Sequence, residues 1–142
     1  MKVALASVLA LVCLGCMQAV AVPGAEVTPD GCLLFSATGQ AVAAKEDDAL
    51  AMAEASLAAC VIAKANLLET IKGAMVSSSV SVGDLMFRSQ EAELKVQGFL
   101  ARATVAVMPP EASRLGASPI VVAKAQLKLA PEEYATLEQF VE

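Results

Sequence analysis

The most regular part of the chain runs from about Asp47 to Lys72, where alanine and leucine dominate and glycine and proline are absent. Asp47 or Asp48 can cap the start of a helix, and Lys72 followed by Gly73 is typical of a helix end. The larger apolar residues recur at helical spacing, at Leu50, Leu57, Val61, Leu68 and Ile71. Alanines assigned to the same face would allow another backbone to approach closely. We therefore predict one long helix packed on a sheet through this face.

Four shorter segments are predicted to be β-strands. The first covers 32–37 and is expected to end at Thr38-Gly39-Gln40. The second covers 74–83, where valines alternate with serines, as in a half-buried strand. The third covers 103–108 and forms a hairpin with the fourth, at 120–129. The residues expected to face the core from the fourth strand are Val121, Ala123, Ala125, Leu127 and Leu129.

Two shorter helices complete the pattern. One is capped by Asp84 and runs to about Val96, with Gly98 near its end. Pro131 begins a C-terminal helix, because proline suits the first helical turn. Its packing face is expected to contain Tyr134, Leu137 and Val141. The order β-α-β-α-β-β-α indicates an α+β fold, in which one long helix packs a small antiparallel-rich sheet.

The N-terminal residues have the layout of a secretory signal peptide. Lys2 gives a positive start, 3–14 is an apolar run, and Ala19-Val20-Ala21 resembles a cleavage site, so cleavage is predicted after Ala21. A buried N-terminal core helix is the alternative. Leu14-Gly15-Cys16 also resembles the end of a bacterial lipobox, which makes Cys16 a lipidation candidate. Lipidation at Cys16 and cleavage after Ala21 exclude each other in one molecule, and the residues leave both open.

Three parts are therefore expected along the chain. Residues 1–21 form the signal peptide, and 22–31, which mixes proline, glycine and aspartate, form a linker. Residues 32–142 form a single α+β envelope domain. Such a chain is expected in the periplasm or at the outer membrane, with a lipid anchor in the inner leaflet if Cys16 is modified.

Composition removes several kinds of chemistry. The chain has no histidine, which excludes Ser-His and Cys-His nucleophile pairs and the commonest neutral metal ligand. The serines at 77–79 have no nearby base to activate them, so no catalytic residue is predicted. Single glycines do not make a phosphate-binding loop, and we expect neither a cofactor nor a metal. A net charge of −5 without a basic cluster makes nucleic acid an unexpected partner.

Two of the four cysteines, Cys32 and Cys60, lie beyond the signal region. They are not spaced as a C-x-x-C pair, so the pattern does not favour zinc or thiol redox chemistry. We expect the first strand and the long helix to bring them close together. An oxidising periplasm would permit a disulfide between them, whereas two buried free thiols are the alternative that the residue type favours.

The stretch from Ala49 to Leu129 resembles a known family. It begins with ALAMAEASLAACVIAKANLLETIKG, followed by MVSSSVSVGD, then VQGFLARATVAV and finally IVVAKAQLKL. Their order and spacing are similar to those of the small bacterial outer-membrane lipoproteins that include flagellar lipoprotein P (FlgP). The resemblance covers most of the chain beyond the signal region.

This resemblance implies a structural subunit of an envelope assembly, namely an outer-membrane-associated flagellar ring or disk component that supports motility. It implies self-association and contact with flagellar motor or outer-membrane proteins, and it implies no catalytic residue. Arg102 stands where flagellar members often have a small residue, so it is a candidate subunit contact with an acid such as Glu91 or Glu111 of a neighbour. A solvated surface charge is the other interpretation of Arg102. The alternative function is an envelope lipoprotein or periplasmic binding module without a motility role.

Overall fold

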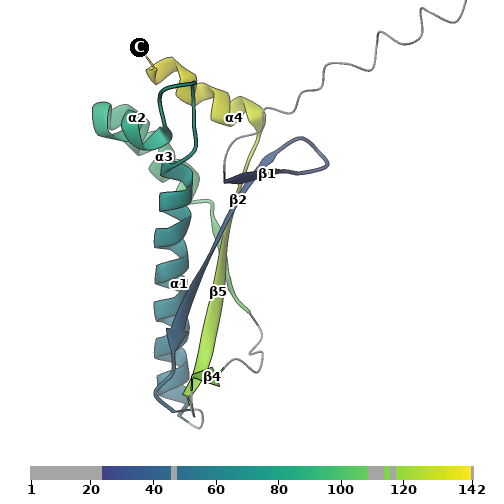
Figure 1. The fold of residues 1–142 in the computed structure, drawn as a ribbon, viewed down its shortest axis with the longest axis vertical. Helices are drawn as coiled ribbons and strands as arrows, with labels where there is room; N and C mark the ends of the chain where they lie inside the picture. The colour runs from purple at the N-terminus through teal and green to yellow at the C-terminus, as the bar shows by residue number, and fades with distance from the viewer. Residues whose placement is uncertain (1–23, 46–47, 109–113, 116–117, 142) are drawn as a thin grey trace, which may run out of the picture.

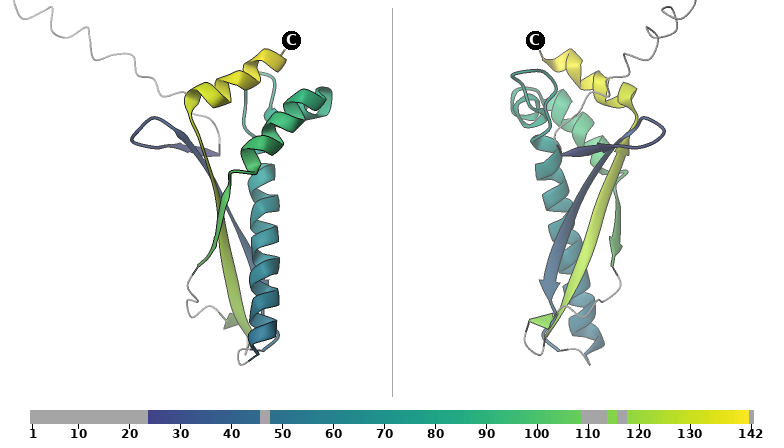
Figure 2. Two further views of the ribbon diagram at one scale, coloured as in Figure 1. Left: turned by 180° about the vertical axis from the view of Figure 1, so that it is seen from behind. Right: turned by 45° about the vertical axis from the view of Figure 1, so that its right-hand side comes forward.

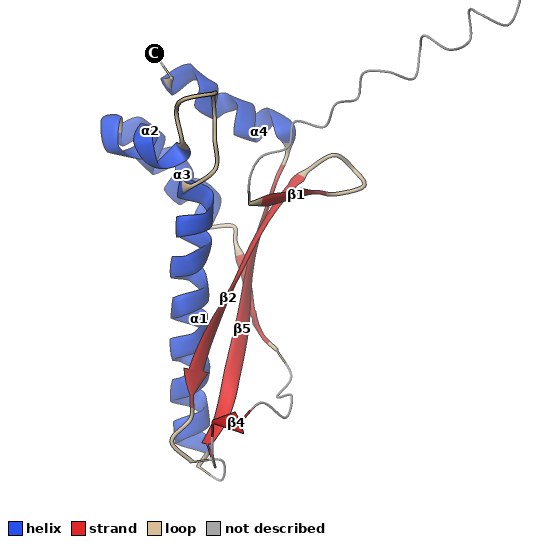
Figure 3. Cartoon of the chain, in the orientation of Figure 1, coloured by secondary structure: helices blue, strands red, loops and turns tan. Residues whose placement is uncertain are grey.

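The computed structural model describes residues 24–45, 48–108, 114–115 and 118–141 of the chain (Figure 1). It has an α+β fold in which one long helix, α1 (Ala49–Lys72), lies along one face of an antiparallel sheet (Figure 3). The predicted fold class is confirmed. The remaining helices gather at the end of α1 that carries its C-terminus.

The sheet is built around two long strands that run side by side. Its order is β1-β2-β5-β3, and β4 pairs separately with the start of β5. Neighbouring strands are antiparallel throughout. The strands are β1 (Ala25–Val27), β2 (Leu33–Val42), β3 (Thr104–Val107), β4 (Arg114–Leu115) and β5 (Ser118–Leu129).

The β2–β5 pair has a continuous register from Leu33 opposite Leu129 to Val42 opposite Ile120. Because strand side chains alternate between faces, every second residue points at α1. The predicted inward residues of 120–129 are all buried, which confirms that part of the pattern. The predicted hairpin of the third and fourth strands is also confirmed, since β3 pairs with β5 from Thr104 opposite Gln126.

The first strand is longer than predicted, and the expected linker contains a strand of its own. β2 continues through Gly39 to Val42 instead of ending at 38–40. Within 22–31, β1 pairs with the start of β2, and the turn between them uses Gly31 at a φ of 85°. Glycine suits this turn because it adopts positive φ without a Cβ clash. The turn residues were visible in the sequence, but three strand residues between them gave no periodic signal.

The caps of α1 were predicted correctly, but its buried face was not. The Asp48 carboxylate accepts hydrogen bonds from the backbone N–H groups of Leu50 (3.0 Å) and Ala51 (3.4 Å), and Gly73 follows the last turn. The buried residues of α1 are Ala55, Ala59, Ala63, Leu67 and Ile71. Of the residues predicted to face the core, only Ile71 is fully buried there, and Leu50, Leu57 and Val61 point to solvent.

Close packing of backbones explains why alanine occupies the buried side. A Cβ atom built on Gly39 would lie 2.3 Å from the Ala63 nitrogen and 2.4 Å from the Ala59 oxygen. The backbones of α1 and β2 are therefore in direct contact at this level. The facing residues on β5, Ala123 and Ala125, are also small and fully buried. Leucines at these helix positions would hold the two layers apart.

The segment 74–83 is not the predicted half-buried strand. It forms a loop with one isolated bridge between Met75 and Ser81, and α2 (Val82–Arg88) begins within it. Ser81 and Asp84 form a capping box, in which each side chain accepts a hydrogen bond from the other residue's backbone N–H. The valine–serine alternation was misleading because the local capping hydrogen bonds favour a helix start over strand pairing.

The predicted helix from Asp84 to Val96 is two helices. Ser89 has an extended backbone, which ends α2, and its hydroxyl accepts a hydrogen bond from the Ala92 N–H at the start of α3 (Gln90–Leu100). The chain ends in α4 (Pro131–Ala135) and a 3₁₀ helix, η1 (Thr136–Phe140). Tyr134 and Leu137 are buried as predicted, and Val141 packs partly buried against the core.

The core has two regions that differ in the size of their side chains. Small residues fill the space where α1 crosses the middle of β2, as described above. Larger residues fill the end covered by α2, α3 and α4 (Figure 2), where the Phe35 and Tyr134 rings lie 6.3 Å apart. The largest side chains that are almost fully buried there are Phe35, Leu67, Ile71, Leu85, Leu127, Leu129 and Leu137.

Candidate interaction surface

The side of α1 that points away from the sheet is apolar and exposed. Leu50 is 68% exposed, Leu57 69% and Val61 59%, and Leu68 continues the same side with partial burial. A scattered exposed leucine needs no explanation, but a row along one helix side is a candidate contact surface. We call the outward residues Leu50, Glu54, Leu57, Val61, Lys64 and Leu68 the outer seam of α1.

Two charged residues interrupt this row. Glu54 and Lys64 are both exposed, and they lie one on each side of the Leu57–Val61 pair in sequence. The part of the chain that the structure describes shows no salt bridge for either residue. The outer seam is therefore an apolar strip with one negative and one positive position.

A helix of this length and composition is long and apolar enough to cross a membrane. In this fold, however, α1 packs mainly against β2 and β5. The Asn66 side-chain amide also donates a 2.8 Å hydrogen bond to the Thr38 carbonyl of β2. This bond lies next to the backbone contact at Gly39, so α1 is fixed to the sheet by both packing and polar interaction.

Arg102 has partners within its own chain. Its guanidinium nitrogen lies 2.8 Å from a Glu133 carboxylate oxygen, and its guanidinium carbon lies 5.7 Å from the centre of the Phe99 ring. Hydrogen bonds from Arg102 and from the Ala130 backbone hold the pKa of Glu133 below its usual range. Arg102 therefore joins the end of α3 to the start of α4. A contact with Glu91 of a neighbouring subunit stays a prediction, and Glu111 lies outside the described residues.

Cys32 and Cys60 are both free thiols, so the candidate disulfide is not formed. The expected proximity is wrong as well. Cys60 follows Ala59, which contacts β2 at Gly39, whereas Cys32 precedes Gly39 by seven strand residues, or about 20 Å at the rise of a strand. Both thiols are only partly buried. The prediction rested only on packing between the first strand and the long helix, which does not specify where along the strand Cys60 lies.

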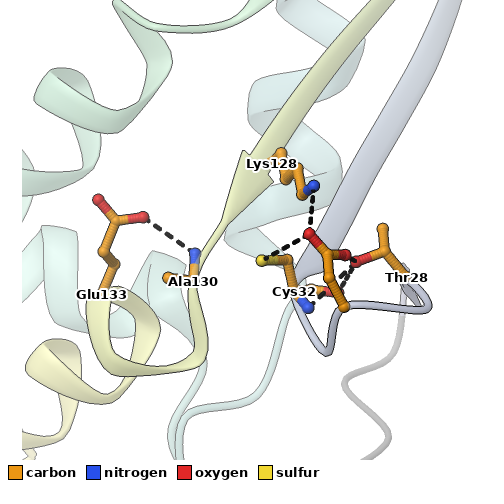
Figure 4. Close-up of polar contacts among 6 residues, drawn as sticks. Thr28, Cys32, Lys128, Ala130 and Glu133 are labelled. Carbon is orange, nitrogen blue, oxygen red and sulfur yellow. Dashed lines mark hydrogen bonds and ion pairs between the residues drawn. The ribbon is translucent and has the colours of Figure 1, made fainter.

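A polar cluster fastens the β1–β2 turn to the end of β5 (Figure 4). The Lys128 ammonium lies 2.7 Å from an Asp30 carboxylate oxygen, and the Thr28 hydroxyl donates a hydrogen bond to the same carboxylate. The bond to Lys128 is the main reason why the pKa of Asp30 falls well below its usual range, and the pKa of Lys128 is raised in return. The Cys32 thiol lies 3.8 Å from Asp30. The charged groups of Asp30 and Lys128 are exposed, and Thr28 and Cys32 are partly buried, so the cluster is a surface tie between strands.

Among the described residues, no polar or charged side chain other than that of Tyr134 is buried, and no three histidine, cysteine, aspartate or glutamate residues form a group that could hold a metal ion. Two predicted positions, Cys16 and Ala21, lie outside the described residues. The outer seam was missed in the sequence because α1 is apolar on both sides, and residue size was taken as the sign of burial. The better signal was the alanine spacing at 55, 59 and 63 together with Gly39.

Tyr134 offers a direct optical test of the packing at the helical end of the core. Its hydroxyl donates a 2.7 Å hydrogen bond to the Met75 carbonyl, and burial, with a smaller effect of Glu138, raises its pKa to about 12. The chain has one tyrosine and no tryptophan, so phenolate absorbance reports on this residue alone. We expect the folded chain to titrate near pH 12 and the urea-unfolded chain near pH 10.

The same pKa shift sets a stability effect at high pH. Because the folded pKa is raised, the contribution of Tyr134 is fully present below pH 10 and is lost as pH rises towards about 12. The loss is about 3 kcal/mol, since the shift is about two pKa units and each unit corresponds to about 1.4 kcal/mol. A folded-state midpoint close to 10 would contradict the buried position of the ring.

Comparison with protein-family models, with curated proteins and with solved structures gave no match.

Proposed function

We propose that this chain is a structural subunit of a bacterial envelope assembly and that it acts by associating with other copies of itself. The observation that carries the proposal is the exposed outer seam of α1. Along its first four turns α1 buries only alanines, and Leu50, Leu57 and Val61 on its outer side are left in solvent, which favours a further protein contact. The signal-like N-terminal residues support export. The exposed Asp30–Lys128 ion pair and its neighbours support a structural role, because they connect strands at the surface.

The resemblance to small outer-membrane lipoproteins supports a more specific role, as a component of a flagellar ring or disk. This role predicts contact with motor or outer-membrane proteins. An envelope lipoprotein or binding module without a motility role would share the same fold and the same α1. Deletion of the gene separates the two roles. Reduced swimming with normal growth supports the flagellar role, and unchanged swimming leaves the general envelope role.

Export can be tested through the two processing signals. We expect intact mass to show either a lipid-modified chain beginning at Cys16 or an unmodified chain beginning at Val22. Cys16→Ser should abolish the lipidated form and move the chain from the membrane to the soluble envelope fraction. If cleavage after Ala21 is the natural route, the same substitution leaves the mass unchanged, because residue 16 has been removed. A main product that retains Met1 would contradict export.

Self-association can be tested with the purified protein. Sedimentation over a wide concentration range should show a reversible increase in mass. Arg102→Ala tests whether Arg102 also contacts a neighbouring subunit, because its guanidinium is already paired with Glu133 of its own chain. If Arg102 is only an intrachain tie, this variant keeps the association of the wild-type chain. A chain that stays monomeric at the highest concentration would contradict the proposed function.

A further inference from the structure

The spacing of the outer seam is that of a helix–helix contact. Successive seam residues, from Leu50 to Leu68, are separated by four, three, four, three and four positions. This alternation is the spacing of the a and d positions that form the contact line of a coiled coil. The described elements cover the opposite side of α1 with the sheet, and Figures 1 and 2 show α2 and α3 near one end of the helix only.

The seam is also nearly the same when it is read in either direction. From the N-terminus it runs Leu, Glu, Leu, Val, Lys, Leu, and reversal exchanges the charged positions and the two central apolar positions. In antiparallel coiled coils, an a residue shares its layer with a d residue of the other helix. An antiparallel pair centred at the level of Ala59 therefore places opposite charges in the same layer. A parallel pair in register would place Glu54 beside Glu54 and Lys64 beside Lys64.

Resting on the self-association proposed above, we infer that the occupant of the outer seam is the seam of a second copy. The two α1 helices pack antiparallel about a two-fold axis. Leu50 lies against Leu68 of the partner subunit, Leu57 against Val61 of the partner subunit, and Glu54 beside Lys64 of the partner subunit. The contact is closed, because each residue pair occurs twice across the axis. The sheets lie on the outer sides of the helix pair.

A second copy fits this surface better than a membrane surface does. Helices that lie on membranes are typically rich in lysine and arginine on their polar face, and this chain has a net charge of −5. In the dimer, the charges of Glu54 and Lys64 are paired, whereas lipid would leave each without a partner. The seam runs over 19 residues, from Leu50 to Leu68, or about 27 Å of helix. This length corresponds to a contact at the small end of specific interfaces, so we expect micromolar dissociation.

Charge exchange tests both the surface and the direction of packing. Glu54→Lys alone places two lysines in each charged layer, and Lys64→Glu alone places two glutamates there. We expect each variant to raise the dimer dissociation constant by about tenfold or more in sedimentation equilibrium at low salt. The double variant restores opposite charges and should return the constant to within about threefold of wild type. Only an antiparallel register predicts this recovery.

Two further variants separate the seam from general effects. Leu57→Gln removes an apolar contact from the centre of the seam and should weaken the dimer at least as much as either charge variant. Lys45→Glu changes an exposed charge outside α1 and should leave the constant unchanged. All the substituted side chains are exposed, so thermal unfolding of the monomers should match wild type at high dilution.

The variants distinguish the antiparallel dimer from another register, another surface, a monomer and a membrane-binding helix. Recovery in the double variant supports the antiparallel pair. Weakening in both single variants without recovery overturns the register. Association that survives Leu57→Gln overturns the seam and leaves self-association through another surface standing. A wild-type chain that is always monomeric overturns the dimer together with the proposed self-association. A monomer that binds anionic lipid vesicles through Leu57 overturns it in favour of a membrane surface.

Discussion

Gly39→Ala should destabilise the fold by about 3 kcal/mol or more, a large effect for the addition of one methyl group. The new Cβ would lie 2.3 Å from the Ala63 nitrogen, 2.4 Å from the Ala59 oxygen and 2.9 Å from the Ile62 carbonyl carbon. All three are backbone atoms of α1, so no side-chain rotation can relieve the clash. The helix must move away from β2, and the Asn66–Thr38 hydrogen bond and the alanine contacts weaken with it.

Gly98→Ala is the matched control for this substitution. Gly98 lies within α3, and a Cβ atom built there has nothing within 4 Å. Alanine should therefore stabilise the chain by about 0.5–1 kcal/mol through its better helix propensity. Urea unfolding followed by circular dichroism measures both changes. If the two variants lose equal stability, the close approach of α1 to β2 is wrong.

The sequence predicted the parts of the fold in which one periodic signal dominates. In β5, large and small apolar residues alternate with lysine and glutamine, so period and burial agree. The caps of α1 were also readable, because the Asp48 carboxylate accepts local backbone hydrogen bonds and the Gly73 N–H donates one to the Glu69 carbonyl at the helix end. Local chemistry of this kind is largely independent of tertiary contacts.

The errors occurred where tertiary geometry decides between two local interpretations. The 74–83 segment has strand alternation, but Ser81 and Asp84 stabilise a helix start at the same place. Gly39 looks like a strand end, but it is a point of backbone contact within a continuous strand. The outer seam could not be assigned from the sequence because α1 has apolar residues all round. Only the partner surface determines which of its sides is buried.

Ala59→Leu should destabilise the chain by about 3 kcal/mol or more, whereas Ala58→Leu should change its stability by less than about 0.5 kcal/mol. Ala59 is fully buried at the contact with Gly39, and Ala58, the preceding residue of the same helix, is exposed. Alanine and leucine are both good helix formers, so propensity alone predicts almost no difference between the two variants. The contrast therefore isolates packing against β2.

This pair of variants reverses what hydrophobic spacing alone predicts. If the row of large residues at Leu50, Leu57 and Val61 were the buried face, a leucine at position 59 would lie in solvent and have little effect. The measurement is urea unfolding at protein concentrations well below the dissociation constant of any dimer, so that association does not contribute. If the two variants were equally stable, the packing of the Ala59 side of α1 on the sheet would be wrong. A large loss confined to Ala59→Leu would show that the alanine side of α1 packs on the sheet and that the outer seam faces away from it.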